Sequence, residues 1–413
     1  MKKSSGNIAK NGVCIAFTGG GTGGHIYPGL AIAAALKKEL NCRIIWVGSK
    51  KQLDASIVEE AGISFYPIPA GKLRRNFSFY NISDFFKVTA GFFAAKKIFK
   101  REKPALLFSK GGFVSVPPCA AAASLHIPVL THESDYSPGL ATRINARFAV
   151  KGAGRIIVAY PETAQQFQQK IRAKVVVLGN PVRAEFRNAD PEKGRAFLGA
   201  EKNDRILLVL GGSQGARELN ELVVSALDEL AKKYFVVHQV GDQKPHAKHR
   251  SCFSSKSNTA CSPINSSVKE ISYGGTAWKG TENTSQHYKP YPYIKNELPD
   301  VLAAAELVLA RSGAGTVWEC ATAGKPMILL PLAGAGTRGD QVENAGFFER
   351  AGAAIVLPPE KRTVKDLLEA VQIITDEKRE VMAAASAMAG STDGTGSIVR
   401  LLVETISQTK GDT

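Results

Sequence analysis

The feature that most constrains the fold is a glycine-rich segment near the amino terminus, Thr18-Gly19-Gly20-Gly21-Thr22-Gly23-Gly24-His25. The apolar run 13–17 before it predicts a buried strand, and residues 27–36 after it predict a helix with Pro28 in its first turn. A strand–turn–helix unit of this kind is typical of an α/β sheet. Glycines in the turn allow a ligand to approach the backbone, and the amino end of the helix directs free N–H groups at negative oxygens.

The alternation of strand and helix patterns continues along the chain. Further strands are expected at 43–47, 64–68, 105–108 and 128–131, and the pattern restarts with a strand at 205–210, a glycine turn and a helix at 216–232. The sequence therefore predicts two similar domains, each with a doubly wound parallel sheet and a ligand-binding edge, with a cleft between them as the natural site. Residues 244–290 are rich in Ser, Asn, Thr, Lys and Gly and predict a flexible surface insertion, after which the regular pattern resumes at Tyr293.

Three more glycine turns follow predicted strands, at Gly111-Gly112, Gly211-Gly212 and Gly313–Gly315. All of them lie at the carboxyl ends of parallel strands, where open α/β sheets bind ligands, and together they favour phosphate binding. None continues as Gly-Lys-Ser/Thr, which argues against ATP hydrolysis, and the second strand ends without the carboxylate that NAD-binding folds use. The chain contains no Asp-x-Asp, so a departing diphosphate would be stabilised by helix ends, hydroxyls and arginines.

Two residues beside these turns are candidates for chemistry. The positive end of a helix dipole disfavours a charged His25, which leaves a neutral imidazole that can accept a proton. The alternative is a histidine that only hydrogen-bonds its own loop. Glu319 follows the fourth glycine turn by one helical turn, where it can accept hydrogen bonds from a ribose diol or simply stabilise the helix dipole. Position alone leaves both alternatives open.

Composition limits the partners. The 413 residues carry a formal net charge of +16, which favours anionic partners such as phosphorylated substrates, an acidic membrane surface or nucleic acid. The six cysteines show no metal-binding or redox spacing, which is typical of reduced thiols in a cytoplasmic protein. No apolar stretch reaches the length of a membrane span, so any membrane contact is expected to be peripheral.

A basic and aromatic stretch, 72–103, contributes much of the positive charge. On a helix five of its phenylalanines (Phe85, Phe86, Phe92, Phe93 and Phe99) fall within one arc together with Lys96 and Lys100. This arc predicts a membrane-contacting patch that includes Phe85, Phe92, Lys96, Phe99 and Lys100. The alternative is an ordinary core-facing helix with a solvated basic end. Nucleic-acid binding is a third possibility, but no nucleic-acid-binding motif accompanies the charge.

Seven motifs then occur in a fixed order: Thr18–His25 with Tyr27–Ala31, Lys110–Ser115, His132-Glu133, Gly179–Arg183, Gly211–Ala216, Arg311–Ala314 and Arg338–Ala345. With these motifs the chain closely resembles the MurG family of bacterial N-acetylglucosaminyltransferases, in glycosyltransferase family 28. The resemblance implies the GT-B fold, in which two Rossmann-like domains face each other across a cleft. It implies an acceptor- and membrane-binding domain at 1–182, a donor-binding domain at 183–390, and a carboxyl-terminal helix at 391–413 that crosses back to the first domain.

The resemblance also implies an activity. The family transfers N-acetylglucosamine, with inversion, from UDP-N-acetylglucosamine to the 4-hydroxyl of the N-acetylmuramoyl-pentapeptide unit of lipid I, the undecaprenyl-pyrophosphoryl acceptor, and forms lipid II. It works peripherally at the cytoplasmic face of the inner membrane, an anionic surface, without a cofactor, a metal or nucleic acid. One departure is that this chain has Ser134-Asp135 where the family usually has Gln-Asn.

By the same resemblance, His25 is the candidate general base, and Asp135 is a second base or orients His25. Ile294 would meet the uracil through its backbone, and Glu319 would bind the ribose. The donor-binding set is Thr22, Gly23, Gly24, Asp135, Arg183, Ser213, Ile294, Ala314, Gly315, Thr316, Glu319, Asp340 and Gln341, and the acceptor diphosphate would lie on Gly111 and Gly112.

Two other function classes stay open at this point. One is an NADP-dependent oxidoreductase that uses Lys50 and Lys51 for the 2′-phosphate. The other is a non-catalytic protein that binds anionic lipid or nucleic acid through its charge, and it predicts binding that weakens steeply with salt.

Overall fold

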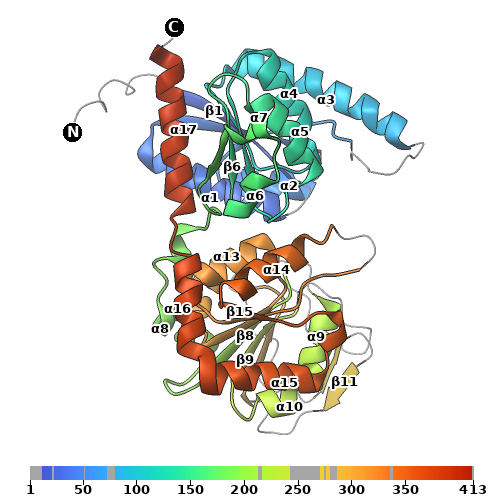
Figure 1. Ribbon diagram of the computed structural model, residues 1–413, viewed down its shortest axis with the longest axis vertical. Helices are drawn as coiled ribbons and strands as arrows, with labels where there is room; N and C mark the ends of the chain where they lie inside the picture. Colours follow the sequence, from blue (N-terminus) through green and yellow to red (C-terminus); the bar gives the residue numbers. More distant parts are fainter. Residues whose placement is uncertain are drawn as a thin grey trace, which may run out of the picture. The chain divides into compact units, whose positions relative to one another are not determined.

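The computed structural model divides the chain into two compact units (Figure 1). Unit 1 contains Met1–Arg183 and Thr392–Thr413, and unit 2 contains Ala184–Ser391. Within these limits the structure describes residues 12–20, 23–50, 52–71, 80–212, 216–241, 270–273, 276–279, 286–334 and 338–411.

Unit 1 is built on a seven-stranded parallel sheet with the order β3-β2-β1-β4-β5-β6-β7. Its strands are β1 (Val13–Thr18), β2 (Cys42–Ser49), β3 (Ser64–Ile68), β4 (Leu107–Ser109), β5 (Val129–Glu133), β6 (Arg155–Val158) and β7 (Val175–Val177). The chain order reverses between β1 and β4, and this switch point is where doubly wound sheets bind ligands.

Helices cover both faces of this sheet. Alternate side chains of β1 point to opposite faces, so Ile15 and Phe17 enter one core while Cys14 and Ala16 enter the other. The first core is closed by α1 (Gly23–Glu39), α2 (Gln52–Glu60) and α17 (Gly394–Gly411), and the second by α3 (Tyr80–Glu102), α4 (Val116–Ser124) and α5 (Leu140–Ala149). Short helices α6 (Pro161–Gln165) and α7 (Gln169–Arg172) complete the unit. The last helix of the chain thus packs in the core of unit 1.

The first helix begins earlier than the sequence predicted. It starts at Gly23, so the final glycines of the loop and His25 form its first turn, and Pro28 lies beyond that turn. The prediction had placed Pro28 in the first turn because a proline interrupts a helix interior. Glycines are tolerated at the start of a helix because the first N–H groups need no partner within it.

Unit 2 repeats the architecture with a six-stranded parallel sheet in the order β12-β9-β8-β13-β14-β15. The strands are β8 (Ile206–Leu210), β9 (Phe235–Gln239), β12 (Tyr288–Tyr291), β13 (Leu307–Ala310), β14 (Met327–Leu329) and β15 (Ala354–Val356). All five residues of β8 are buried, as expected for a parallel strand covered on both faces. The switch point lies between β8 and β13.

Over its described residues, the α-helices of unit 2 are α8 (Pro191–Leu198), α9 (Arg217–Ser225), α10 (Leu227–Leu230), α12 (Leu298–Ala304), α13 (Ala314–Thr322), α14 (Asp340–Arg350), α15 (Val364–Ile373) and α16 (Arg379–Ala389). One core is formed between α9, α10, α15 and the sheet. Two such doubly wound units confirm the predicted fold class.

The predicted insertion, 244–290, was partly wrong. Its last residues form β12, an edge strand that pairs with β9, and Tyr288 and Tyr291 are buried there. An antiparallel hairpin, β10 (Glu270–Tyr273) and β11 (Thr276–Lys279), lies in its middle. Composition concealed these strands, because four-residue strands between polar segments produce no lasting apolar period. Apart from residues 286–287, the rest of the insertion lies outside the described part of the chain.

Candidate active site

In unit 1 the glycine loop after β1 and the turn after β4 are neighbours. Thr18 pairs with Ser109 at the carboxyl ends of these strands, and the Lys110 N–H donates to the Thr18 carbonyl at 2.8 Å. The sheet therefore brings two of the predicted phosphate-binding turns together at its switch point.

The imidazole of His25 lies against the backbone of the second turn. A Cβ atom placed on Gly112 would lie 3.7 Å from carbons of this ring and 2.9 Å from the Gly20 carbonyl oxygen. Gly111 and Gly112 also have φ angles of 86° and 77°, which disfavour other residues. The structure thus brings His25, Gly111 and Gly112 together, and the backbone beside the imidazole ring carries no side chains.

Two buried side chains that sequence reasoning missed shape the glycine loop. The indole N–H of Trp46, on β2, donates to the Gly19 carbonyl at 3.0 Å. Asp54, on α2, accepts a hydrogen bond from Ser49 at 2.6 Å, and its carboxylate leaves no room for a side chain on Gly20. Sequence reasoning could not connect Trp46 and Asp54 with the glycine loop, because both residues are distant from it in the sequence and approach it only in the folded chain.

The segment after β5 is held by the carboxylate of Glu133. Its two oxygens accept hydrogen bonds from the N–H groups of Ser134, Asp135 and Gly139 and from the hydroxyl of Thr142. Burial, with the charge of Asp135, raises the pKa of Glu133 against these hydrogen bonds, which lower it. The backbone position of Asp135 is therefore fixed by its neighbour.

A buried lysine joins this segment to the turn after β4. Lys110 Nζ lies 3.0 Å from His132 Nδ1 and donates to the Ser134 hydroxyl. The Ser134 hydroxyl donates to Asn180 Oδ1 at 2.6 Å, and His132 Nε2 lies 3.1 Å from the Gly179 carbonyl oxygen. Lys110, His132 and Asn180 each belong to one of the sequence motifs, but nothing in the sequence indicates that they contact one another.

In unit 2 the amino end of α13 is open. Gly313 occupies its N-cap without a side-chain cap, and among the described residues no atom beyond the chain neighbours and the helix's own backbone lies within 4 Å of a Cβ placed on Gly313 or Gly315. Ala314, Gly315 and Thr316 are all partly exposed, and Glu319 lies one turn further along the same helix, also partly exposed. Free N–H groups, open space and a carboxylate one turn away suit a diphosphate followed by a ribose.

The amino end of α14 is tied to the same region. The Ser312 hydroxyl donates to the Gln341 carbonyl at 2.7 Å, and Gln341 Oε1 accepts the Leu332 N–H at 2.8 Å. Asp340 accepts a hydrogen bond from Arg338 Nε at 2.7 Å. The side-chain oxygen of Gln341 therefore holds its own loop, and its amide nitrogen is the group suited to meet a sugar hydroxyl.

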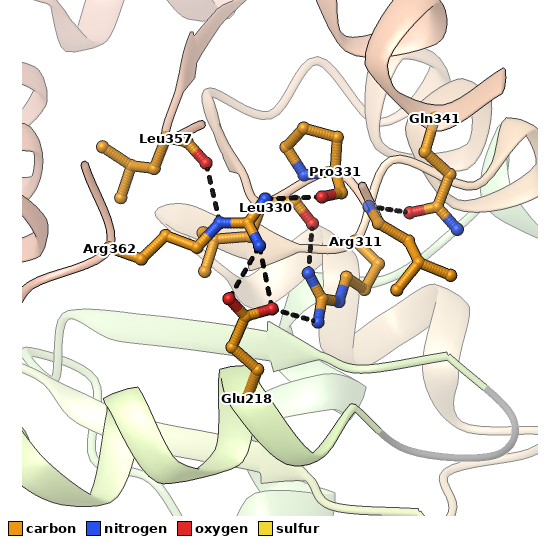
Figure 2. A network of polar contacts seen from close by, with 8 residues as sticks. Glu218, Arg311, Leu330, Pro331, Gln341, Leu357 and Arg362 are labelled. Carbon is orange, nitrogen blue, oxygen red and sulfur yellow. Dashed lines mark hydrogen bonds and ion pairs between the residues drawn. The ribbon is translucent and has the colours of Figure 1, made fainter. Parts of the chain in front are cut away.

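A three-residue ion cluster lies at the carboxyl ends of the strands of unit 2 (Figure 2). Glu218, on the first turn of α9, accepts hydrogen bonds from Arg311 at 2.8 Å and from Arg362 at 2.7 and 2.8 Å. Arg311 also donates to the Leu330 carbonyl, and Arg362 to those of Pro331 and Leu357. This cluster, which we call the Glu218 brace, joins the first turn of α9 to the segments that follow β13, β14 and β15.

The brace carries two positive charges and one negative charge. Burial raises the pKa of Glu218, but the hydrogen bonds from Arg362 and Arg311 outweigh it and lower the pKa overall. Glu218 is thus ionised at neutral pH and leaves one net positive charge at this edge. Arg311 stood in a recognised motif, whereas nothing in the sequence singled out Glu218 or Arg362.

Ile294 is buried, and its N–H donates to Gln239 Oε1 at 3.0 Å, so in this structure only the Ile294 carbonyl is left to meet a base. Gly23 begins α1, Gly24 is exposed beside it, and Arg183 is partly exposed at the end of the first stretch of unit 1. Thr22 and Ser213 lie outside the described residues, as does Lys51.

The membrane-patch prediction needs a correction within α3. Phe99 is 1% exposed and belongs to a core of unit 1, and Phe92 is partly buried against that core. The helix turns Phe85, Phe86 and Phe93 outward instead, the last of them 62% exposed. The predicted arc was broad enough to span both the core-facing and the solvent-facing side, because both carry phenylalanines. Lys96 and Lys100 are partly or fully exposed, and Lys96 Nζ lies 5.6 Å from the centre of the Phe92 ring.

In the described part of the chain, no helix is long and apolar enough to cross a membrane. Over the same residues, no three His, Cys, Asp or Glu side chains are grouped for metal binding.

The fold defines a class of protein. Solved structures with the same fold include a MurG from Acinetobacter baumannii, with a TM-score of 0.67 and 23% identity over 95% of this chain and 99% of that one. Another is CalG4, the calicheamicin glycosyltransferase, with a TM-score of 0.60 and 15% identity over 97% of this chain and 99% of that one. The fold is therefore the GT-B fold of glycosyltransferases.

Sequence comparison identifies the family of glycosyltransferases to which the chain belongs. The model of the glycosyltransferase family 28 N-terminal domain matches residues 15–153, and that of the family 28 C-terminal domain matches residues 206–398. The chain belongs to glycosyltransferase family 28. A relative in Treponema denticola, named UDP-N-acetylglucosamine--N-acetylmuramyl-(pentapeptide) pyrophosphoryl-undecaprenol N-acetylglucosamine transferase, is 48% identical over 91% of this chain and 93% of that protein. A Bacillus cereus protein with the same name, numbered 2, is 37% identical over 95% of this chain and 99% of its own length. The chain is thus a glycosyltransferase, and the resemblance to the MurG family is confirmed.

Proposed function

We propose that this enzyme transfers N-acetylglucosamine from UDP-N-acetylglucosamine to the 4-hydroxyl of the N-acetylmuramoyl unit of lipid I, with inversion, and forms lipid II for peptidoglycan. The observation that carries the proposal is the imidazole of His25 against the bare backbone of Gly111 and Gly112, in a family 28 chain whose relatives bear the name of this reaction. No observation on the described residues favours the oxidoreductase or the non-catalytic binding protein.

On the acceptor side, the roles follow from unit 1. The positive φ angles of Gly111 and Gly112 and the N–H group of Gly112 suit the acceptor diphosphate, whereas the Gly111 N–H donates to Ser109 Oγ at 3.3 Å. His25 accepts the proton of the attacking hydroxyl as the new glycosidic bond forms. Asp135, in the segment that Glu133 holds, supports the base or contacts the sugar.

On the donor side, the roles follow from unit 2. The N–H groups of Ala314, Gly315 and Thr316 bind the diphosphate and stabilise the negative charge that develops on the departing UDP. Glu319 binds the ribose hydroxyls, and the amide of Gln341, with Asp340, binds the sugar. Ser213 and the Ile294 carbonyl complete the donor contacts of unit 2, and by the family resemblance Thr22, Gly23, Gly24 and Arg183 of unit 1 also bind the donor.

We also propose that α3 contacts an anionic membrane surface at the cytoplasmic face of the inner membrane. Phe85, Phe86 and Phe93 present apolar area, and Lys96 and Lys100 supply charge beside it. Replacing both lysines with Glu should weaken binding to vesicles that contain phosphatidylglycerol, by about 1 kcal/mol for each positive charge removed. Unchanged binding of this double variant would refute the patch.

The reaction is tested by incubating the purified chain with UDP-N-acetylglucosamine and a lipid I analogue and analysing the lipid product by mass spectrometry. The proposal predicts a product heavier than the acceptor by one N-acetylhexosamine, in β linkage. An acceptor that stays unmodified, with UDP-N-acetylglucosamine bound tightly by the folded protein, would exclude this acceptor.

A further inference from the structure

We propose that Lys110 is a positioning residue of the acceptor site, which holds the Ser134-Asp135 segment and the Gly179-Asn180 backbone in one arrangement around His25 and Gly111. This inference rests on the proposed function, because it assigns the acceptor side to unit 1.

The first argument is burial. Lys110 is 2% exposed, yet its ammonium group lies at the carboxyl ends of the strands, directly before the Gly111-Gly112 turn. A buried charge costs free energy, and an apolar side chain of similar volume usually stabilises a fold as well or better. Packing alone therefore does not account for a lysine here, whereas the arrangement of its partners does.

The second argument is hydrogen bonding: two chains of hydrogen bonds begin at the ammonium group of Lys110, and we call them its two branches. In the first branch, a carbonyl only accepts hydrogen bonds, so the 3.1 Å contact with Gly179 places the proton of His132 on Nε2. His132 Nδ1 is then an acceptor, and Lys110 donates to it at 3.0 Å. Burial and the charge of Lys110 lower the pKa of His132 well below its ordinary value, so the ring stays neutral and keeps this arrangement.

In the second branch, the Ser134 hydroxyl gives its proton to Asn180 Oδ1 at 2.6 Å and accepts from Lys110 with a lone pair. Lys110 thus reaches Gly179 through His132 and Asn180 through Ser134. Three loops, those after β4, β5 and β7, are held by a single side chain.

The third argument is charge. The titratable groups around Lys110 are His132, Glu133 and Asp135 at the end of β5, with His25 on α1 beside the same turn. Burial lowers the pKa of Lys110 to about 8, although Glu133 and Asp135 raise it. The group is therefore mostly charged at neutral pH and loses its charge at moderately alkaline pH.

The charge of Lys110 interacts with that of Asp135, which raises the pKa of Lys110, and Asp135 is the residue at which the chain departs from the asparagine usual in its family. A neighbouring ammonium group compensates the extra carboxylate, so Lys110 and Asp135 make sense as a pair. A neutral amine still donates two hydrogen bonds, so alkaline pH removes mainly the charge, and substitution removes both the charge and the hydrogen bonds.

The test is steady-state kinetics of the full chain with a lipid I analogue from pH 6 to 10. For the unmodified enzyme we expect kcat/KM for the acceptor to fall above pH 8 to a lower plateau, because deprotonation removes the charge of Lys110 and leaves its two hydrogen bonds in place. Lys110→Arg, whose guanidinium stays charged, should remove that fall. Lys110→Met should lower kcat/KM for the acceptor at least tenfold at pH 7.5, with KM for UDP-N-acetylglucosamine changed less than twofold.

Lys325→Met is the matched control. Lys325 is partly buried, and it donates to the Ala303 carbonyl at 2.7 Å in unit 2, away from the glycine turns. This variant should lose thermal stability and keep both the acceptor kinetics and the pH profile.

The inference is overturned if the unmodified enzyme shows no fall up to pH 9.5, or if Lys110→Met keeps kcat/KM for the acceptor within twofold. If Lys110→Met does not fold, the profiles of the unmodified enzyme and of Lys110→Arg decide. Absence of transfer by the unmodified chain would count against the proposed function and not against this inference.

Discussion

The Glu218 brace gives the sharpest prediction about the donor side. Glu218→Gln keeps the shape of the side chain and one oxygen acceptor but removes the charge that two arginines share. Arg362 has a side chain only 6% exposed, so it would be left without a counterion in a poorly solvated position.

The expected loss of folding free energy in Glu218→Gln follows from the same contacts. A hydrogen bond to a charged group contributes about 1.5–3 kcal/mol, and removing one partner of a buried ion pair costs about 3–5 kcal/mol. Because the side chain of Glu218 is 47% exposed, water compensates part of this loss, and we expect a cost of about 2 kcal/mol. For a unit of this size, that lowers the melting temperature by about 4–8 °C.

The effect of Glu218→Gln on donor binding distinguishes a positioning role of the brace from a purely stabilising one. Arg311 directly precedes Ser312 and α13, so loosening the brace should move the loops proposed to bind the diphosphate. We expect KM for UDP-N-acetylglucosamine to rise on the order of tenfold, which corresponds to about 1.4 kcal/mol. Calorimetry and donor titration in initial-rate assays measure the two effects.

Glu306→Gln is the control. Glu306 pairs with Arg205 at 2.6 Å, but both residues precede their strands and so lie at the amino ends of β13 and β8. This variant should lose comparable stability without a change in donor KM. If Glu218→Gln loses stability and keeps the donor KM of the unmodified enzyme, the brace does not position the donor site.

Three further predictions follow. His25→Ala should lower kcat by about 10²–10⁴-fold if His25 is the base, and a loss below tenfold would remove it from that role. Phe93→Ala should weaken binding to anionic vesicles about tenfold at an unchanged melting temperature, because Phe93 is exposed. Phe99→Ala should instead cost about 3–5 kcal/mol of folding free energy, because Phe99 is buried. Vesicle binding by Phe93→Ala as tight as that of the unmodified enzyme would contradict the assignment of Phe93 to the membrane surface. Burial lowers the pKa of His238 to about 3, so the unfolded chain takes up a proton below about pH 6.5 while the folded chain does not. Stability should fall by about 1.4 kcal/mol per pH unit from pH 6 to 4, less in His238→Gln, and an identical fall in that variant would rule this source out.

The sequence predicted the fold well because its signals were local. Each strand is a short apolar run, and each glycine turn follows one directly, so the two doubly wound sheets could be expected before any packing was known. The errors fell where local signals were weak. β12 is four residues long and contains a proline, and the start of α1 consists of glycines, which are poor helix formers away from a helix end.

The candidate site was predictable where a motif lies on one loop and unpredictable where it is assembled from several. His25 and Gly112 were both singled out, and the adjacent strands β1 and β4 bring them together. The Lys110 branches and the Glu218 brace each join residues from three or more elements. A side chain such as Arg362 shows in sequence neither its burial nor its partner. Phe99 was misassigned for a related reason, since helical spacing does not say which side of an aromatic arc faces the core.

The most direct test of the account is acceptor-dependent release of UDP by the purified chain, with UDP-N-acetylglucosamine, a lipid I analogue and excess EDTA. The account predicts release that requires the acceptor and is unaffected by EDTA. Release that is absent with both substrates present, or that proceeds equally without the acceptor, would contradict it.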